Sequence, residues 1–231
     1  MPNSFLSRHK HTLGILSSLV LASSICFGLI VLRAARTHEP KFGYLLWNLF
    51  LAWIPLLCAL AAYQLHWTKS KVAHLAALLC AATWLLFFPN APYVLTDLLH
   101  LRVQDNPIFW YDLILLLAFA WTSFLLGCIS LYLMHDLVTH RLGRWAGWAF
   151  ALATLGLSSF GIYLGRFLRW NSWDVIFNPH SLWADIWQIL RHPIANRDTF
   201  IFSLFFSLFS FSVYVTLFSF SRLQGERRRI E

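Results

Sequence analysis

Long apolar stretches separated by short polar ones dominate this chain. Six of them are long enough, at about 20 residues each, to cross the roughly 30 Å hydrocarbon core of a membrane. They cover about residues 13–33, 43–63, 72–88, 110–133, 146–168 and 199–220. Lipid offers no hydrogen-bond partners to the backbone, so each stretch is predicted to be a helix. The pattern predicts an all-α membrane protein with six transmembrane helices and short interfacial helices in a single domain, residues 1–231.

The third apolar stretch ends in "FFPNAPYVLTDLLHL", residues 87–101. Pro89 is predicted to end the preceding helix, and Pro92 suits the first turn of a new one with Asn90 as N-cap. At about 100° per residue, Val94 and the leucines cover one side of that helix. The opposite side carries Asn90, Tyr93, Thr96, Asp97 and His100. This predicts a short amphipathic helix over about 90–101, lying in the interface or dipping into the bundle.

Asp97 and His100 are three residues apart, which places both on one face of that helix. Such a pair can be a carboxylate that orients a general-base imidazole. It can also be two ligands of one metal ion, or a hydrogen-bonded pair that only lets a polar face meet water. These alternatives remain open at this point. Asp97 and His100 are the candidate catalytic residues, and the metal is unknown.

A second polar segment, "GRFLRWNSWDVIFNP", follows the fifth apolar stretch at residues 165–179. Trp and Arg favour the membrane boundary, so this segment can be an aromatic exit from the bilayer. Alternatively, its arginines form a clamp for phosphate or carboxylate, or pair with Asp97 or Asp174. We expect Arg166 to approach Asp97, because an unpaired arginine at this depth is costly. The candidate substrate-binding residues are Asn90, Tyr93, Arg166, Arg169, Asn171 and Asp174.

Two further polar segments have simpler interpretations. "SLWADIWQILRHP" predicts a second interfacial helix over about 181–192, capped by Ser181 and ended before Pro193. We interpret it as a membrane anchor. "HDLVTHR" is predicted to lie in a loop, residues 134–145, where its histidines and aspartate face solvent rather than bind a metal.

Charge adds an orientation to this picture. Only 12% of the residues are charged, and the net charge of +8 is scattered over short loops, which argues against a nucleic-acid partner. Ten of the 18 Lys and Arg residues lie on the side of the two termini: Arg8, Lys10, Lys69, Lys71, Arg141, Arg144, Arg222, Arg227, Arg228 and Arg229. This excess predicts that both termini are cytoplasmic. The mixed charges on the other side, including Asp97 and Arg166, are then extracytoplasmic.

The spans themselves contain few reactive or ionisable side chains. Cys26, Cys58, Cys80 and Cys128 fall one in each of the first four spans, and none has the close pairing of a zinc or redox motif. We therefore expect no cofactor. The middles of all six spans lack ionisable residues, which disfavours a proton-coupled pump. Membrane lipids are the expected partners, and the oligomeric state is left open.

Three stretches carry a resemblance to a known family: "FFPNAPYVLTDLLHL", "WYDLILLLAFAWTSFLLGCISLYLM" and "FGIYLGRFLRWNSWDV". Together with the spacing of the spans, they make residues 45–218 resemble a family of bacterial multi-pass membrane proteins called domain of unknown function 1361. The resemblance implies a bacterial inner-membrane protein of this architecture. It implies no activity.

The two polar segments together predict a site at the extracytoplasmic membrane boundary that handles an anionic lipid or envelope precursor by acid–base chemistry. Two alternatives remain. The site can bind without reaction, as in a small permease or channel, or the same residues can pair internally in a structural or assembly protein. The nucleophile and metal motifs of soluble enzymes are missing from the sequence, so whether the protein is an enzyme stays open.

Overall fold

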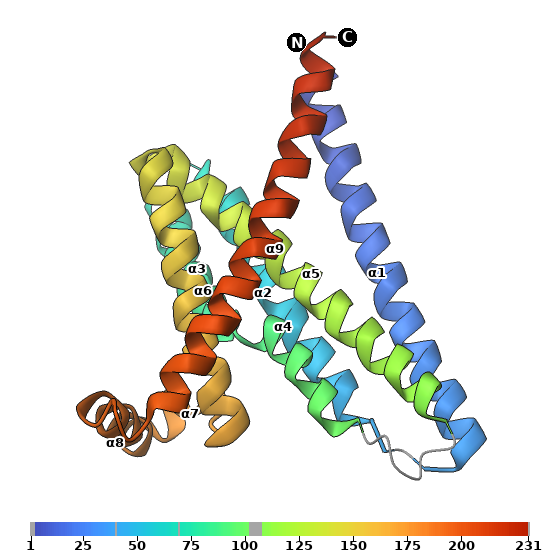
Figure 1. Cartoon of the computed structure of the whole chain (residues 1–231). Helices are drawn as coiled ribbons and strands as arrows, with labels where there is room; N and C mark the ends of the chain where they lie inside the picture. Colours follow the sequence, from blue (N-terminus) through green and yellow to red (C-terminus); the bar gives the residue numbers. More distant parts are fainter. Residues whose placement is uncertain (1–2, 40, 69, 102–107, 231) are drawn as a thin grey trace.

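The structure is a computed structural model that describes residues 3–39, 41–68, 70–101 and 108–230, with side chains described from 13 to 221 within these ranges. Every regular element in these ranges is helical, and Figure 1 shows their arrangement. The long helices are α1 (Asn3–Thr37), α2 (Tyr44–His66), α3 (Lys71–Phe87), α5 (Phe109–Leu142), α6 (Arg144–Phe167) and α9 (Arg197–Ile230). The short ones are α4 (Asn90–Tyr93), the 3₁₀ helix η1 (Val94–His100), α7 (Asp174–Phe177) and α8 (Pro179–Arg191).

Six segments of the described chain are long and apolar enough to cross a membrane, which confirms the predicted fold class. They are the six long helices, with α4 and η1 continuing α3. Successive long helices run in alternate directions, so both termini and the α2–α3 and α5–α6 connections lie at one end (Figure 1). We call this the terminal end. The opposite end carries η1, α7 and α8, and we call it the α8 end.

Helix α5 is central to the packing. One core cluster joins it to α1, α2 and α4 around Leu45, Leu116 and Phe119. A second cluster lies towards the terminal end and joins α2, α3, α5, α6 and α9 around Trp84 and Tyr214. The short helices η1, α7 and α8 lie at the α8 end instead, and so do the two polar segments.

The predicted loop 134–145 is wrong, because α5 continues to Leu142 and only Gly143, with a φ of 92°, separates it from α6. The apolar pattern ends earlier than the helix does, since polar residues near a membrane surface still form helical turns. His135 is consequently buried rather than facing solvent. Its Nδ1 lies 2.8 Å from the Tyr214 hydroxyl, and its ring stacks on Phe218.

The helix predicted over 181–192 is present as α8 but begins at Pro179. Proline suits this first position because the lost N–H has no partner there in any case. The predicted Ser181 cap is therefore wrong, and no side-chain cap is present at Asn178. Leu182 and Ile189 of α8 pack against Leu164.

The break after α3 lies inside the bundle, which is one of the two placements predicted for it. Ala91 is fully buried, and its Cβ lies only 3.0 Å from where a Cβ on Gly127 of α5 would be. Gly161 of α6 approaches Pro89 in the same way, at 3.4 Å. Two glycines on neighbouring helices thus make room for the turn. Asn90 is not the N-cap, since Pro89 takes that position.

Candidate functional site

An ion pair between η1 and α6 holds the two polar segments together. Arg166 Nη2 donates to Asp97 Oδ1, and Arg166 Nε donates to Thr96 Oγ1 at 2.8 Å. The guanidinium carbon also lies 4.5 Å from the centre of the Tyr93 ring, a cation–π geometry. The Asp97 side chain is 2% exposed and that of Arg166 is 12% exposed. The predicted approach of Arg166 to Asp97 is confirmed.

Asn48 of α2 is a further hydrogen-bond partner of the Asp97 carboxylate. Its Nδ2 donates to Asp97 Oδ2 at 2.8 Å, so both carboxylate oxygens accept a hydrogen bond. Sequence reasoning missed Asn48. The available signal was its chemistry, because a lone amide in an otherwise apolar span needs a hydrogen-bond partner.

His100 takes a more exposed position than Asp97. Its side chain is 48% exposed, and its Nδ1 lies 3.8 Å from Asp97 Oδ1 and 3.2 Å from the Asp97 carbonyl oxygen. The ring lies near Tyr44, with 5.5 Å between ring centres. Among the residues described, no group of three His, Cys, Asp or Glu side chains could hold a metal ion. His100 is therefore near the Asp97 carboxylate but not within hydrogen-bond distance of it.

The segment after α6 is shaped by Asp174. This carboxylate accepts hydrogen bonds from the Asn171 backbone N–H at 2.8 Å and from Asn178 Nδ2 at 2.9 Å. These donors, the backbone N–H first, hold the pKa of Asp174 below its usual value because they favour the charged form. Asp174 thus fixes the loop over residues 171–178 from within. Asn171 Nδ2 also lies 3.3 Å from the same carboxylate.

Arg169 adopts a φ of 63°, the left-handed region that glycine usually occupies just after a helix. The chain turns there, and the Trp170 N–H donates back to the Leu164 carbonyl at 3.2 Å. The Arg169 side chain is exposed, and none of the described residues forms a hydrogen bond or ion pair with it. Arg166 and Arg169 therefore do not form a joint clamp on one partner.

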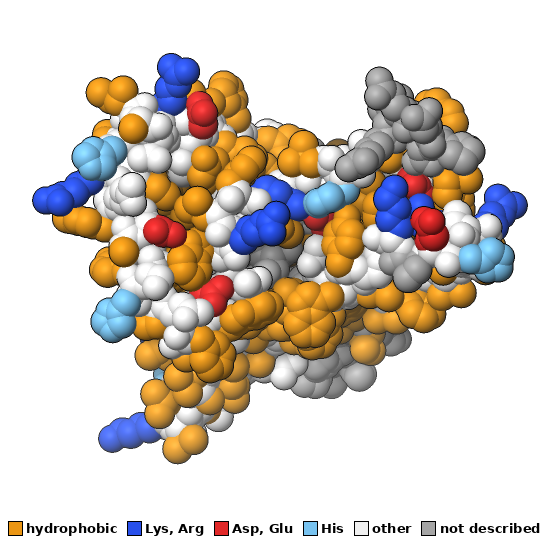
Figure 2. Space-filling view, turned by 90° about the horizontal axis from the view of Figure 1, so that it is seen from below, with side chains coloured by type: hydrophobic (Ala, Val, Ile, Leu, Met, Phe, Trp, Pro, Cys, Tyr) orange, Lys and Arg blue, Asp and Glu red, His pale blue; other side chains and the backbone are white. Residues whose placement is uncertain are grey.

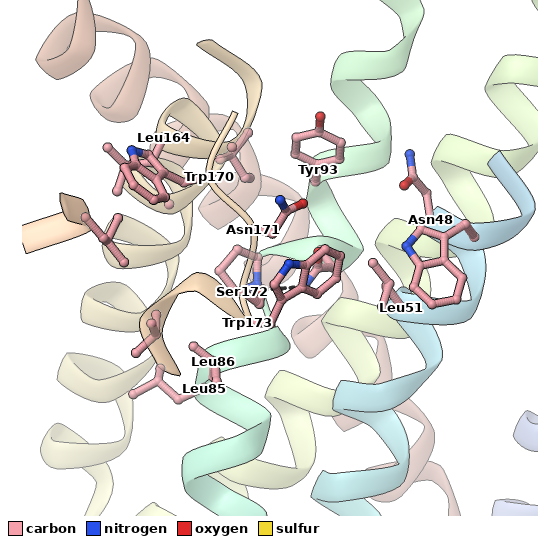
Figure 3. Close-up of a pocket in the computed structure, with 18 of the residues that line it drawn as sticks. Asn48, Leu51, Leu85, Leu86, Tyr93, Leu164, Trp170, Asn171, Ser172 and Trp173 are labelled. Atoms are coloured by element: carbon pink, nitrogen blue, oxygen red, sulfur yellow. Dashed lines mark hydrogen bonds between the residues drawn. The ribbon is translucent and has the colours of Figure 1, made fainter. Parts of the chain in front are cut away.

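A pocket of about 580 Å³ lies beside the ion pair at the α8 end (Figure 3). Its walls come from α2, α3, the α3–α4 break, α6 and residues 170–175, with Leu182 of α8. In Figure 3, Trp173 extends from the loop towards α2, where Asn48 and Leu51 lie. Of the eight residues predicted for the site, three line the pocket: Asn90, Tyr93 and Asn171.

The lining divides by chemistry. Polar side chains are Asn48, Asn90, Tyr93, Asn171 and Ser172, and large aromatic ones are Trp47, Trp170 and Trp173. The apolar remainder includes Leu51, Leu85, Leu86 and Leu182. Among the described residues that line it, none is Asp, Glu, Lys, Arg or His.

Two hydrogen bonds fasten the loop side of the pocket. Asn90 Nδ2 donates to Ser172 Oγ at 2.9 Å, which joins the loop to α4 (dashed in Figure 3). Trp170 Nε1 donates to Asp185 at 2.9 Å, which joins the loop to α8. Sequence reasoning named neither Ser172 nor this role of Asp185.

A second buried ion pair lies at the same end. Arg33 of α1 contacts both oxygens of Asp112 of α5, at 2.7 and 3.3 Å, and its guanidinium lies over Phe42 at 4.7 Å. It ties α1 to α5 and does not line the pocket. Viewed from the α8 end, basic side chains gather near the middle of the face, with histidine and acidic side chains beside them and apolar ones around (Figure 2).

Comparison with known proteins assigns the chain to a family. Residues 47–213, more than half of its length, match the family model described as "Protein of unknown function (DUF1361)". The chain belongs to this family. No curated protein and no solved structure matched the chain. The DUF1361 match runs from Trp47 in α2 to residue 213 in α9, and so it contains Asp97, Arg166 and every residue that lines the pocket.

Proposed function

We propose that this DUF1361 protein binds a membrane amphiphile, an anionic lipid or a lipid-linked envelope precursor, in the pocket at its α8 end. The observation that supports the proposal is that the pocket is lined by both polar and apolar side chains. Amides and hydroxyls lie in the same cavity as leucines, and a molecule with a polar headgroup and an acyl chain satisfies both. The volume of about 580 Å³ is within the range of roughly 300–1,000 Å³ that small-molecule sites occupy.

The border of the pocket suits a ligand that arrives from the bilayer. Trp47 of α2 and Leu85 of α3 line the pocket and are 53% and 44% exposed. Exposed apolar side chains on membrane-spanning helices face acyl chains. An amphiphile can therefore enter between these residues without leaving the membrane, while Trp47 suits the boundary between headgroups and chains.

Arg169 is the candidate contact for an anionic group. The charge of Arg166 is already compensated by Asp97, whereas Arg169 is exposed and directly precedes the lining residue Trp170. Its left-handed backbone costs roughly 1 kcal/mol, which a glycine would avoid. An arginine kept in that conformation is consistent with a role for its side chain.

Binding is better supported than acid–base catalysis by Asp97 and His100. In that chemistry Asp97 would orient the His100 imidazole as general base, but His100 Nδ1 lies 3.8 Å from Asp97 Oδ1, beyond hydrogen-bond distance, and neither residue lines the pocket. We propose that Asp97 positions Arg166 and, with it, the ring of Tyr93 on the pocket wall. A structural or assembly role is the second candidate, because the same hydrogen bonds link α2, η1 and α6.

Both orientation and compartment are part of the proposal. The excess of Lys and Arg at the terminal end favours a cytoplasmic location for both termini. The α8 end, with its pocket, then faces the extracytoplasmic side of a bacterial inner membrane. Lipid precursors of the cell envelope are present in that leaflet.

Thermal stability in detergent tests the proposal. A ligand that binds only the folded state raises the midpoint of unfolding, by an amount that grows with the logarithm of its concentration relative to Kd. We expect a bacterial lipid extract to raise the melting temperature of the delipidated wild-type protein. In Leu86→Trp, the larger side chain extends into the apolar part of the pocket and obstructs the acyl chain, and the increase should be lost.

Leu79→Trp is the matched control. Leu79 lies on the same helix, is 60% exposed and does not line the pocket. It should respond to the extract as the wild type does. An equal response of Leu86→Trp and the wild type would show that lipid acts on the outer surface only, and the structural role would then be favoured.

A further inference from the structure

The three asparagines that line the pocket share an orientation that restricts the ligand. In each, the amide nitrogen donates to the protein: Asn48 to Asp97, Asn171 to Asp174, and Asn90 to Ser172 and the Phe87 carbonyl. Among the described residues, none donates a hydrogen bond to any of the three amide oxygens. The polar wall therefore presents three amide oxygens as hydrogen-bond acceptors, beside the second N–H groups of Asn48 and Asn171.

An acceptor-rich wall discriminates between headgroups. Phosphate oxygens only accept hydrogen bonds, so a phosphate in the pocket would leave the three amide oxygens without a donor. An ammonium group only donates, and the guanidinium of Arg169, which pairs with none of the described residues, disfavours a second cation at this end. A neutral group with several hydroxyls donates without adding charge. This chemistry fits a lining in which the described residues carry no charge.

The aromatic side chains that line the pocket also favour a neutral headgroup with several hydroxyls. Trp47 and Trp173 border the pocket, and among the described residues no hydrogen bond is made by their indole N–H groups or by the Tyr93 hydroxyl. These groups can donate to ring and hydroxyl oxygens. The indole faces also offer a flat surface for the C–H side of a sugar ring.

We infer that the pocket binds the sugar headgroup of a membrane glycolipid, with the sugar among Asn48, Asn90, Asn171 and the tryptophans, and the acyl chain along the leucines. The inference rests on the proposed function, since it names the class of amphiphile. Arg169 at the rim is then available to a phosphate that links sugar and lipid.

The test compares headgroups on identical acyl chains. The protein is held in a polyoxyethylene detergent, which carries no sugar, and its melting temperature is titrated with dioleoyl lipids. The probes are monoglucosyl diacylglycerol, phosphatidic acid and phosphatidylethanolamine, with free glucose as a fourth. We expect the glucosyl lipid to reach half-maximal effect at a concentration at least about tenfold lower than the phospholipids, as one or two added hydrogen bonds predict.

Each outcome decides a separate point. A stronger response to phosphatidic acid or phosphatidylethanolamine overturns the sugar assignment and leaves lipid binding intact. No response to any lipid overturns the proposed function itself. A response to free glucose equal to that of the glucosyl lipid overturns the requirement for an acyl chain.

One conservative variant tests the wall directly. Tyr93→Phe removes only the hydroxyl and keeps the ring beneath Arg166, so the fold is retained. We expect about a five- to tenfold higher half-maximal concentration of glucosyl lipid, the effect of one lost hydrogen bond, and no change for phosphatidic acid. Tyr163→Phe, whose ring packs on Phe167 away from the pocket, is the control. Equal responses of the two variants would contradict the inference.

Discussion

At the scale of residues, the site depends on two side chains that neutralise each other. Asp97 and Arg166 come from segments 69 positions apart and are both largely removed from solvent. Breaking a buried pair leaves an uncompensated charge, which costs far more than the pair contributes. The pair therefore keeps η1 and α6 in contact, and with them the wall of the pocket.

Asp97→Asn should lower the free energy of unfolding by about 3 kcal/mol or more, because the amide keeps the shape but leaves Arg166 buried and unpaired. Asp198→Asn is the matched control, since Asp198 is 84% exposed and lies 3.8 Å from Arg197. It should show no measurable change. Unfolding in detergent titrated with dodecyl sulfate measures both. Equal stability of the two variants would contradict the account of Asp97.

The lowered pKa of Asp174 predicts a pH dependence of the loop over residues 171–178. Because its folded pKa lies below the ordinary value of about 4, its stabilisation is present above that value. It is lost as pH falls through the lowered pKa. Cleavage of this loop by pepsin should stay slow at pH 4 and become fast at lower pH. Asp174→Asn should be cut quickly at both. A loop in the wild type that is cut equally fast at pH 4 and at lower pH would show that Asp174 does not hold it.

At the scale of elements, the turn between α3 and η1 depends on the glycines that face it. A Cβ at Gly127 would lie 3.0 Å from that of Ala91, while a Cβ at Gly156 meets nothing within 4 Å. Gly127→Val should therefore destabilise the protein by about 1–3 kcal/mol through overpacking. Gly156→Val should be tolerated. Unfolding measurements on both variants check this, and a neutral Gly127→Val would mean that α4 is not packed against α5.

The elements also show what sequence alone predicts. Apolar length predicted the six spans, and the cost of an unpaired Arg166 predicted its approach to Asp97. The end of α5 was misplaced because hydropathy follows the membrane and not the helix. The partners of Asn48 and Asp174 depend on how helices rotate and how a loop closes. Those are tertiary properties that no local pattern encodes.

At the scale of the whole molecule, the even number of spans places both termini at one end, opposite α8 (Figure 1). With the basic excess at the terminal end, we predict that both termini are cytoplasmic. Alkaline phosphatase fused after Glu231 should be inactive, and fused after Ile194, in the connection between α8 and α9, it should be active. The reverse pattern would place the pocket on the cytoplasmic side.

The central claim is that the pocket at the α8 end holds a lipid. Native mass spectrometry of the protein released from nanodiscs into lipid-poor detergent tests it most directly, because it counts the lipid molecules that each chain retains. The account predicts one tightly retained lipid on the wild type and on Leu79→Trp, and none on Leu86→Trp. A wild type that retains no lipid, or a Leu86→Trp variant that retains as much as the wild type, would contradict it.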